Sequence, residues 1–463
     1  MSASDPGWKQ ARTFRFLSAT YTPETGKAKL RYALDDAAGN STRLVETITF
    51  PYSPWPSEPS RQDALQKALR LLHLVAGVSY YKAVVPPSVE MEGEPIDRPF
   101  AMFLNDLYIQ GLAEFAYQNE IDLSSKIDFQ SLCAQDPLPP VVPPELVLPE
   151  RALVAMGGGK DSLVALTLLQ EQEMESQPIC VGSAHLIEDT TRAAGLPLLR
   201  IGRQLDPALA EMNREGALNG HVPVTAINSA ILLCASVLYG YRYIVFANER
   251  SADQATMRIG RDQEINHQYS KTSRFEAGFR ALIKREVSPD IEYFSILRPY
   301  SELAIVGRFS QLDQYHDVFS SCNRNFHLDG SRTVGRWCGD CPKCRFTALA
   351  LAVFMSPEEV TAIQGTDLLN DSDQLDGFRE LCRLGREKPF ECVGEYGECR
   401  AAMQALASDK AWRDHAVVVA LLPELAGVET PSLESVISAS ERHFIPSVLV
   451  PEALTASFDS NAD

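Results

Sequence analysis

The segment that most constrains the fold of this chain is a glycine-rich stretch between two apolar stretches. It reads Gly157-Gly158-Gly159-Lys160-Asp161-Ser162. Residues 152–155 before it are apolar and suit a buried strand, and residues 163–169 after it suit a helix. Because glycine lets the backbone approach an anion closely, and because the first amides of a helix have no partner within the helix, such a stretch can surround a phosphate. The sequence therefore predicts a phosphate-binding loop in an α/β fold.

Two common phosphate-binding motifs fit this loop poorly. A Walker loop needs four residues between its first glycine and a Gly-Lys-Ser/Thr end, and that spacing is absent. The dinucleotide-binding fingerprint needs a third glycine where Ser162 stands, and an acidic residue on a second strand at the expected distance, which is missing. Both motifs stay open as weaker alternatives, as does a glycine-rich turn that binds no ligand.

Further strands and helices alternate beyond the loop. Residues 178–181 and 243–246 suit buried strands. The apolar run 227–238 contains Asn228 and two serines and is too short for a bilayer, so it predicts a buried helix. This alternation indicates a parallel sheet covered on both faces. We assign residues 150–355 to this α/β domain.

The chain on either side of this domain has a different character. Residues 14–50 contain three runs of period two, which predict a small antiparallel sheet, and two helices are expected over 62–75 and 103–118. We therefore assign residues 1–136 to an N-terminal α+β domain. Six of the thirteen residues 137–149 are proline, a density typical of an extended linker. Residues 356–463 are expected to form an acidic, mostly helical C-terminal region.

The charge of the chain disfavours a polyanionic partner such as nucleic acid. There are 61 Asp and Glu against 43 Lys and Arg, a formal net charge of −18. Residues 356–463 hold 20 acidic and 8 basic residues, and no basic patch offsets them. The N-terminus shows neither a secretory signal nor a membrane anchor, so we expect a cytoplasmic protein with no membrane partner.

Four of the ten cysteines form a group with the spacing of metal ligands. They are Cys322, Cys338, Cys341 and Cys344. A reducing cytoplasm favours metal binding over disulfides, and four thiolates with no open position are typical of structural zinc. An iron–sulfur cluster and unliganded buried thiols remain alternatives. Isolated Cys133, Cys180 and Cys234 are expected in or near the core.

Polar residues after the strand 243–246 are candidates for catalysis and binding. In an open α/β sheet the ligand lies beyond the carboxyl ends of the strands. Glu249, His267 and Lys271 are candidate proton carriers, and Arg250 and Arg258 are candidate ligands for a substrate carboxylate or phosphate. Further candidates are His221 and the C-terminal thiols of Cys382, Cys392 and Cys399. For each residue, an ordinary structural or surface role is the alternative.

The glycine loop resembles the Ser-Gly-Gly-x-Asp-Ser loop of the ATP pyrophosphatase (PP-loop) superfamily, with Gly157 in place of the usual serine. The resemblance implies a parallel-sheet PP-loop fold of the HUP type that binds ATP. Gly158, Gly159 and Ser162 would then hold the β and γ phosphates, Asp161 would help hold Mg²⁺, and Lys160 would supply positive charge. Such enzymes attack the α-phosphorus, release diphosphate and leave an adenylated substrate.

The order of motifs along the whole chain resembles a narrower family, the UDP-N-acetyl-α-D-muramoyl-L-alanyl-L-glutamate epimerases (MurL). The matching stretches are residues 30–36, 76–83, the glycine loop, 248–252, 264–267, the cysteine quartet and 388–395. The resemblance implies a cytoplasmic enzyme of peptidoglycan precursor synthesis, and hence of cell shape and division. It would invert the terminal L-Glu of the UDP-linked muramoyl dipeptide, consuming ATP with Mg²⁺ and releasing AMP and diphosphate.

Two other classes of function remain open from the sequence. One is another adenylating PP-loop transferase, such as a deazaguanine nitrile synthase, which carries a similar cysteine quartet after its ATP fold, or a tRNA thiolation enzyme. The negative charge disfavours the tRNA enzyme, and the nitrile synthase is normally a shorter chain without the leading domain. The second class is a non-catalytic ATP-binding module.

Overall fold

The computed structural model describes residues 7–51, 55–134, 142–182, 185–255, 257–259, 263–326, 335–385, 391 and 393–451. Most of the strands form one nine-stranded sheet in the order β11-β8-β5-β6-β7-β3-β2-β1-β4. Their bounds are β1 Ala11–Thr22, β2 Lys27–Asp36, β3 Ser41–Thr49, β4 Ser88–Met91, β5 Ala152–Ala155, β6 Ser176–Val181, β7 Leu199–Gln204, β8 Tyr243–Phe246 and β11 Glu292–Ser295. A separate hairpin pairs β9, Met257–Ile259, with β10, Gln263–Ile265.

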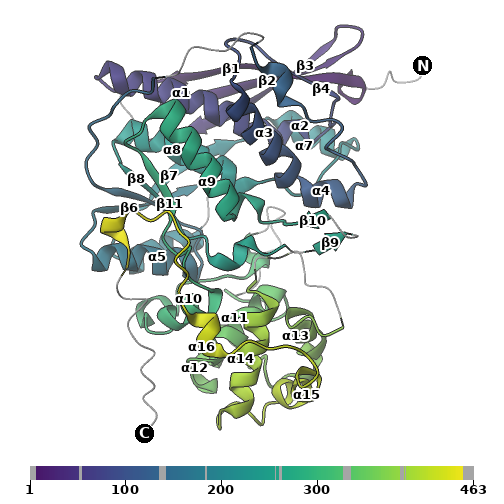
Figure 1. Ribbon diagram of the computed structural model, residues 1–463, viewed down its shortest axis with the longest axis vertical. Coiled ribbons are helices and arrows are strands. Elements are labelled where there is room, and N and C mark those ends of the chain that lie inside the picture. The colour runs from purple at the N-terminus through teal and green to yellow at the C-terminus, as the bar shows by residue number, and fades with distance from the viewer. Residues whose placement is uncertain are drawn as a thin grey trace.

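The helices surround this sheet and continue beyond it (Figure 1). Those up to β8 are α1 Pro59–Ala76, α2 Val78–Tyr81, α3 Arg98–Gly111, α4 Ala113–Gln118, α5 Lys160–Glu171, α6 His185–Ala193, α7 Pro207–Arg214 and α8 Val224–Tyr239. Those after it are α9 Ser273–Leu282, α10 Glu302–Phe309, α11 Pro342–Ala352, α12 Pro357–Gln364, α13 Leu375–Leu381, α14 Tyr396–Ser408, α15 Ala416–Leu425 and α16 Leu433–Ile437.

The five strands β11, β8, β5, β6 and β7 are parallel, as the alternating strands and helices predicted. Alternate side chains of β5 enter different cores, because successive residues of a strand point to opposite faces. Leu153 packs in the core that contains α1 and α8, whereas Ala152 and Val154 pack in the core that contains α5 and α10. The predicted α/β class with a mostly parallel sheet is confirmed.

The antiparallel strands β1, β2 and β3 are also confirmed, and they continue the same sheet. The junction is the antiparallel pairing of β3 with β7, with Thr47 opposite Gln204. Buried Glu46 supports this junction, because its Oε1 accepts a hydrogen bond from Nε of Arg203 at 2.7 Å. The residues that we expected to form an N-terminal unit are therefore joined to the parallel strands edge to edge.

Several elements differ from the sequence expectation in extent. Helix α5 begins at Lys160, three residues before the expected start, since Gly159 precedes it in an extended conformation. The strands β4, β7 and β11 were not predicted. Of the proline-rich linker, residues 142–149 contain neither helix nor strand, and residues 137–141 lie outside the described part of the chain.

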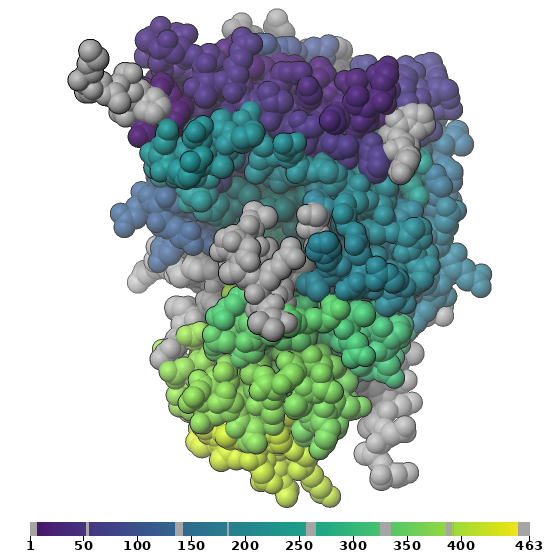
Figure 2. All heavy atoms as spheres, turned by 180° about the vertical axis from the view of Figure 1, so that it is seen from behind, coloured from purple at the N-terminus to yellow at the C-terminus, as the bar shows by residue number. Residues whose placement is uncertain are grey.

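Helices α11 to α16 form a layer at the far end of the molecule from β1 to β4 (Figure 1). The view from behind shows the same order, with the N-terminal residues at one end and the C-terminal residues at the other (Figure 2). Residues 356–451 contain helices and, where described, no strand. Within the described residues, every helix is too short or too polar to cross a bilayer.

Candidate functional site

A cleft of about 360 Å³ lies beyond the carboxyl ends of β5 and β8. The chain leaves β5 toward β6 on one side, and β8 lies on the other side, so the strand order reverses at β5. Such a reversal opens a crevice in a parallel sheet, and ligands bind there. The lining residues are Ala155, Met156, Gly157, Gly159, Asp161, Ser162, Thr225, Asn228, Phe246, Ala247, Asn248, Lys271, Ser320, Ser321, Asn323 and Lys343.

The glycine loop forms the floor of this cleft in a conformation that favours glycine at one of its positions, Gly158. Gly158 has a φ of +78°, which other residues rarely adopt. A Cβ at Gly159 would lie 3.2 Å from Oγ of Ser321, a tight contact that the serine side chain would have to relieve. A Cβ at Gly157 would meet nothing within 4 Å, which leaves room there for the serine of the PP-loop pattern. The loop therefore leaves open space next to the start of α5.

The segment Ser320–Asn323 forms the wall that faces the loop. The amide of Ser320 donates to the carbonyl of Gly158 at 3.3 Å, which ties the wall to the floor. Oγ of Ser320 accepts from the amide of Cys322 at 3.1 Å and donates to the carbonyl of Arg336 at 2.6 Å. Ser321, Asn323 and Lys343 thus place hydroxyl, amide and ammonium groups around a space bordered by the glycine loop.

A second, smaller cavity of about 30 Å³ adjoins the cleft and shares four lining residues with it. It is large enough for one or two water molecules. The lining residues are Lys160, Asp161, Glu249, Lys271, Glu302, Ser321, Lys343, Phe346 and Thr347. We call it the inner cavity. Three carboxyl groups and three lysines therefore meet in a small space, which is the kind of setting in which proton transfer occurs.

Lys160 is held inside the protein by two carboxylates. Its Nζ donates to Oδ1 of Asp161 at 2.6 Å and also to Oε2 of Glu302. Burial disfavours the ammonium, but the charges of Asp161 and Glu302 outweigh it and raise the pKa of Lys160 above its usual value. Burial, reinforced by the charge of Asp161, raises the pKa of Glu302. The ammonium is therefore engaged by carboxylates beside the loop.

Glu249 is the third carboxyl group of the inner cavity, beside Asp161 and Glu302. It is 5% exposed, and its carboxylate has no hydrogen bond or ion pair within the described residues. Its oxygens are not among the described side-chain atoms that are both fully buried and without a partner, so they keep contact with the open space of the cavity. Glu249 lies three residues after the end of β8, in the segment where the sequence predicted functional side chains.

A buried arginine, Arg298, holds the backbone of two candidate residues, Glu249 and Lys271. Arg298, 2% exposed, pairs with Glu276 at 2.8 Å between Nη2 and Oε2. Its Nη1 donates to the carbonyl of Glu249 at 2.7 Å, and its Nη2 donates to the carbonyl of Lys271 at 2.6 Å. One guanidinium therefore sets the positions of two loops that line the inner cavity.

Replacing Arg298 with methionine is expected to lower the free energy of unfolding by about 3–5 kcal/mol, because Glu276 would remain as an unpaired buried charge. Urea unfolding followed by circular dichroism measures this loss. The double variant Arg298→Met with Glu276→Gln should recover part of it, since the buried charge is gone while the acceptor for the amide of Ser295 is kept. Equal losses in the single and double variants would contradict the pairing.

The remaining sequence candidates lie in different surroundings. His267 has its ring 6.3 Å from that of His221, outside the lining of the cleft, and burial together with the charges of His267 and Lys271 lowers the pKa of His221 to about 4. The guanidinium of Arg250 donates to the carbonyls of Val436 and Ser438 at the end of α16. Arg258 lies in β9, and its side chain is outside the described part of the structure.

The C-terminal thiols lie away from the cleft where they are described. Cys382 and Cys399 are buried in the core formed with the C-terminal helices. Burial raises the pKa of Cys382 to about 12, which keeps its thiol protonated at neutral pH. Cys392 lies outside the described residues.

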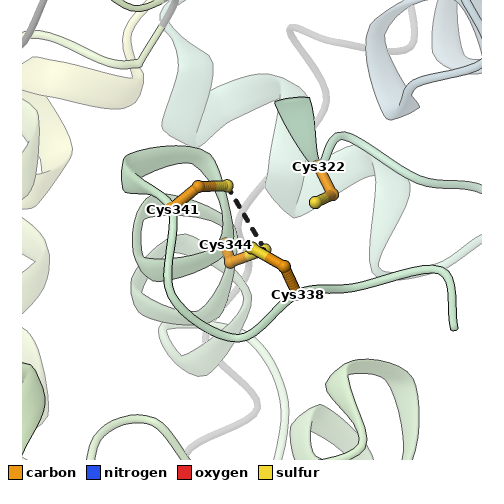
Figure 3. Close-up of side chains that lie close together, drawn as sticks. All are labelled: Cys322, Cys338, Cys341 and Cys344. Atoms are coloured by element: carbon orange, nitrogen blue, oxygen red, sulfur yellow. Dashed lines mark hydrogen bonds between the residues drawn. The ribbon is translucent and has the colours of Figure 1, made fainter. Parts of the chain in front are cut away.

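The cysteine quartet converges as its spacing predicted. The ligand sulfurs of Cys322, Cys338, Cys341 and Cys344 all lie within 4.8 Å of one another, and Figure 3 shows the four side chains gathered around one point. Sγ of Cys344 is 3.7 Å from that of Cys338 and 3.5 Å from that of Cys341. A tetrahedral ion with metal–sulfur bonds of about 2.3 Å needs sulfurs about 3.8 Å apart. The quartet can therefore hold one metal ion.

Comparisons with known proteins show which family the chain belongs to. Residues 6–296 match the family model described as the MurL N-terminal domain, and residues 318–435 match the MurL C-terminal domain. The chain belongs to the MurL family. A protein of Xanthomonas oryzae pv. oryzae named UDP-N-acetyl-alpha-D-muramoyl-L-alanyl-L-glutamate epimerase is 44% identical over 452 residues, 97% of this chain and 98% of that protein. A protein of the same name from Salinispora tropica is 40% identical, covering 94% of this chain and 93% of its own length.

The two MurL domains both contribute to the cleft. Of the residues that line the cleft, those of the glycine loop and Lys271 fall in the range of the N-terminal domain, whereas Ser321 and Lys343 fall in that of the C-terminal domain. Glu302 lies between the two matched ranges. The site of this MurL family member is therefore assembled where its domains meet.

Several lining residues were not predicted from the sequence. Ser320, Ser321 and Asn323 flank the first ligand of the quartet, and Lys343 lies between two others, so their proximity to a recognisable motif was the available signal. Asn228 and Thr225 are polar residues in an otherwise apolar helix, and this contrast could have identified them as candidates. Glu302 is 142 residues from Lys160 in the sequence, and it belongs to no sequence motif that would have marked it as part of the site.

Proposed function

We propose that this chain inverts the terminal L-Glu of UDP-N-acetylmuramoyl-L-alanyl-L-glutamate to D-Glu, in a reaction that consumes ATP and releases AMP and diphosphate. Its relatives carry the name of this epimerase over nearly the full length of the chain. The observation that supports ATP dependence is the glycine loop at the point where the strand order reverses, next to a cavity lined by charged groups. We assign the reaction to peptidoglycan precursor synthesis in the cytoplasm.

The chemistry of the substrate explains why ATP is needed. Removing the α-proton next to an ionised carboxylate would place a second negative charge on the same group. The glutamate nitrogen is part of a peptide bond, so it cannot form a Schiff base. Adenylation neutralises the carboxyl and makes the α-proton far more acidic. A base can then remove the proton, reprotonation on the other face gives D-Glu, and water releases AMP.

The cleft fits the phosphates of ATP in its shape and donors. Gly158, Gly159 and Ser162 would hold the β and γ phosphates, and Asp161, with its side chain 30% exposed, would help hold Mg²⁺. Bound Mg²⁺ would offset phosphate charge. Lys160, engaged by Asp161 and Glu302, would contribute positive charge from behind the loop rather than a direct contact.

Glu249 is the strongest of the candidate proton carriers. It is a mostly buried residue that lines the inner cavity, and this cavity shares lining residues with the cleft. Lys271 lines both cavities and is the second candidate. His267 and the substrate-binding candidate Arg250 have less support, because neither of these described residues lines either cavity. Arg258 stays a candidate, since its side chain lies outside the described part of the structure.

We also propose that the cysteine quartet binds a structural zinc ion. Four sulfur ligands leave no position open for a substrate, and the 3.5 and 3.7 Å sulfur separations suit tetrahedral Zn²⁺. The ion would then hold together two segments that line the cleft.

One incubation tests the proposed reaction. The protein is mixed with ATP, Mg²⁺ and the UDP-linked dipeptide in deuterated water, and products are identified by mass spectrometry. AMP together with deuterium at the glutamate α-carbon is the expected result. ADP in place of AMP, or AMP without solvent exchange, would overturn the epimerase proposal. Omitting the dipeptide is the control, and steady AMP formation without it would also count against the proposal.

A further inference from the structure

Lys343 is a cation that connects the metal-binding motif to the cleft. It lies in Cys341-Pro342-Lys343-Cys344, between two members of the quartet. Helix α11 begins at Pro342, so Lys343 stands in its first turn. The residue lines both the cleft and the inner cavity. A lysine at the boundary of two cavities can reach a ligand in the larger one and still face the carboxyl groups of the smaller one.

The position of Lys343 suits an anion in the cleft. The glycine loop borders the same space from below, and Ser321 and Asn323 border it from the side. Negative charge is already placed at the start of α11, because the carboxylate of Glu391 accepts hydrogen bonds from the side chain of Asn323 and the amide of Lys343 and also interacts with the charge of Lys343. Of the other two lysines of the inner cavity, Lys160 is already bonded to two carboxylates, whereas Lys271 lines the cleft as Lys343 does. A bulky anion at the loop can therefore be met by the ammonium groups of Lys343 and Lys271.

The quartet fixes both segments of this wall. Cys322 directly follows Ser321, and Cys341 and Cys344 flank Lys343. One ion bound by all four sulfurs would join these two segments, which are far apart in sequence, at a fixed separation. The hydrogen bonds of Ser320 to Gly158 and Arg336 connect the same wall to the loop.

We propose that Lys343 is a phosphate-binding residue of the cleft and that the metal ion in the quartet positions it against the glycine loop. The ligand class is a nucleoside triphosphate or its diphosphate product, whose oxygens the ammonium contacts. This inference rests on the proposed function only in taking the cleft as the place where ATP binds. It assigns to the metal-binding motif a part in ligand recognition as well as in stability.

Binding measured without the dipeptide tests the role of Lys343. Isothermal titration calorimetry with ATP and Mg²⁺, and separately with inorganic diphosphate, is carried out on the wild type, Lys343→Gln and Lys343→Arg. Loss of one charged hydrogen bond is expected to weaken both ligands about 10- to 100-fold in Lys343→Gln. Lys343→Arg should retain most of the affinity. Lys410→Gln, at an exposed lysine in the C-terminal region, is the matched control and should bind as the wild type does.

Removing the metal tests the positioning role. Wild type and Lys343→Gln are treated with a zinc chelator, checked for folding by circular dichroism and titrated again. The metal-free wild type is expected to bind as weakly as metal-loaded Lys343→Gln, and chelation should add little further loss in that variant. Unchanged nucleotide affinity after chelation would overturn the positioning role. Elemental analysis should show equal metal content in both proteins before treatment.

The outcomes separate this inference from the proposed function. If the wild type binds ATP and diphosphate and Lys343→Gln binds them equally well, the role of Lys343 is overturned while the epimerase proposal stands. If the wild type binds neither ligand, both are overturned. If binding weakens in Lys343→Gln but no α-deuterium appears in the incubation described above, the phosphate-binding role stands and the epimerase proposal does not.

Discussion

Asp161→Asn is expected to reduce AMP formation by at least about 10²- to 10³-fold, as loss of a group that stabilises charge in the transition state does. The carboxylate lines both cavities and lies at the start of α5, where it would hold Mg²⁺ against the phosphates. Asparagine keeps the shape and removes the charge, so the loss reports on metal binding rather than on packing. Turnover is followed as AMP released, with the Mg²⁺ concentration varied.

The structure suggests two controls for this variant. Asp63→Asn changes an exposed carboxylate on α1 that pairs with Lys67, and it should leave turnover unchanged. Lys160 keeps its bond to Glu302 when Asp161 is replaced, so the thermal unfolding midpoint should move little. Near-normal AMP formation in a folded Asp161→Asn protein would remove this residue from the site.

The sequence predicted the parts of the fold that depend on local pattern. The period-two runs correctly predicted the strands β1 to β3, and the apolar run around Asn228 correctly predicted the buried helix α8. Helix α5 begins at Lys160, whereas the sequence predicted a start at Leu163. The prediction relied on apolar periodicity, and the first turn of α5 begins with the charged residues Lys160 and Asp161. What decides that first turn is the extended Gly159 before it, not hydrophobicity.

The continuity of the sheet could not be predicted from local pattern. It depends on the pairing of β3 with β7, in which Ile48 lies opposite Arg203, 155 positions away in the sequence. The strand β7 carries Arg200 and Arg203, so it lacks the apolar run of a buried parallel strand. Arg203 instead neutralises buried Glu46 across the junction. A charged strand of this kind is recognised only once its partner is known.

The sequence predicted those parts of the candidate site that belong to a recognisable motif. It missed the residues that only tertiary packing brings to the site. The glycine loop and the cysteine quartet are contiguous patterns, and Glu249 follows a strand that the sequence had already placed. Glu302 reaches Lys160 only because α10 packs against α5, and Glu398 of α14 in turn accepts from the amide of Leu303 at 2.9 Å. Burial, with the charge of Glu302, raises the pKa of Glu398 to about 8. The C-terminal helices thus contact the support of the loop.

Cys341→Ser is expected to have the largest effect on stability. A structural zinc ion contributes about 10–16 kcal/mol of apparent binding energy in small domains, and part of that would be lost with one of its four ligands. The sulfur of Cys341 lies 3.5 Å from that of Cys344, and the residue precedes α11. We expect a purified variant with little zinc and a clearly lower thermal midpoint. Elemental analysis and differential scanning calorimetry measure the two quantities.

Cys133→Ser is the matched control for this change. Cys133 is partly buried and lies outside the quartet, so its replacement should leave both the zinc content and the midpoint nearly unchanged. Added zinc should raise the midpoint of metal-depleted wild type and not that of Cys341→Ser, because binding to the folded state alone stabilises it. A wild type that contains no zinc and is insensitive to chelation would contradict the structural-zinc proposal. Iron with the visible absorption of a cluster would contradict both that proposal and the fit of the four sulfurs to a single ion.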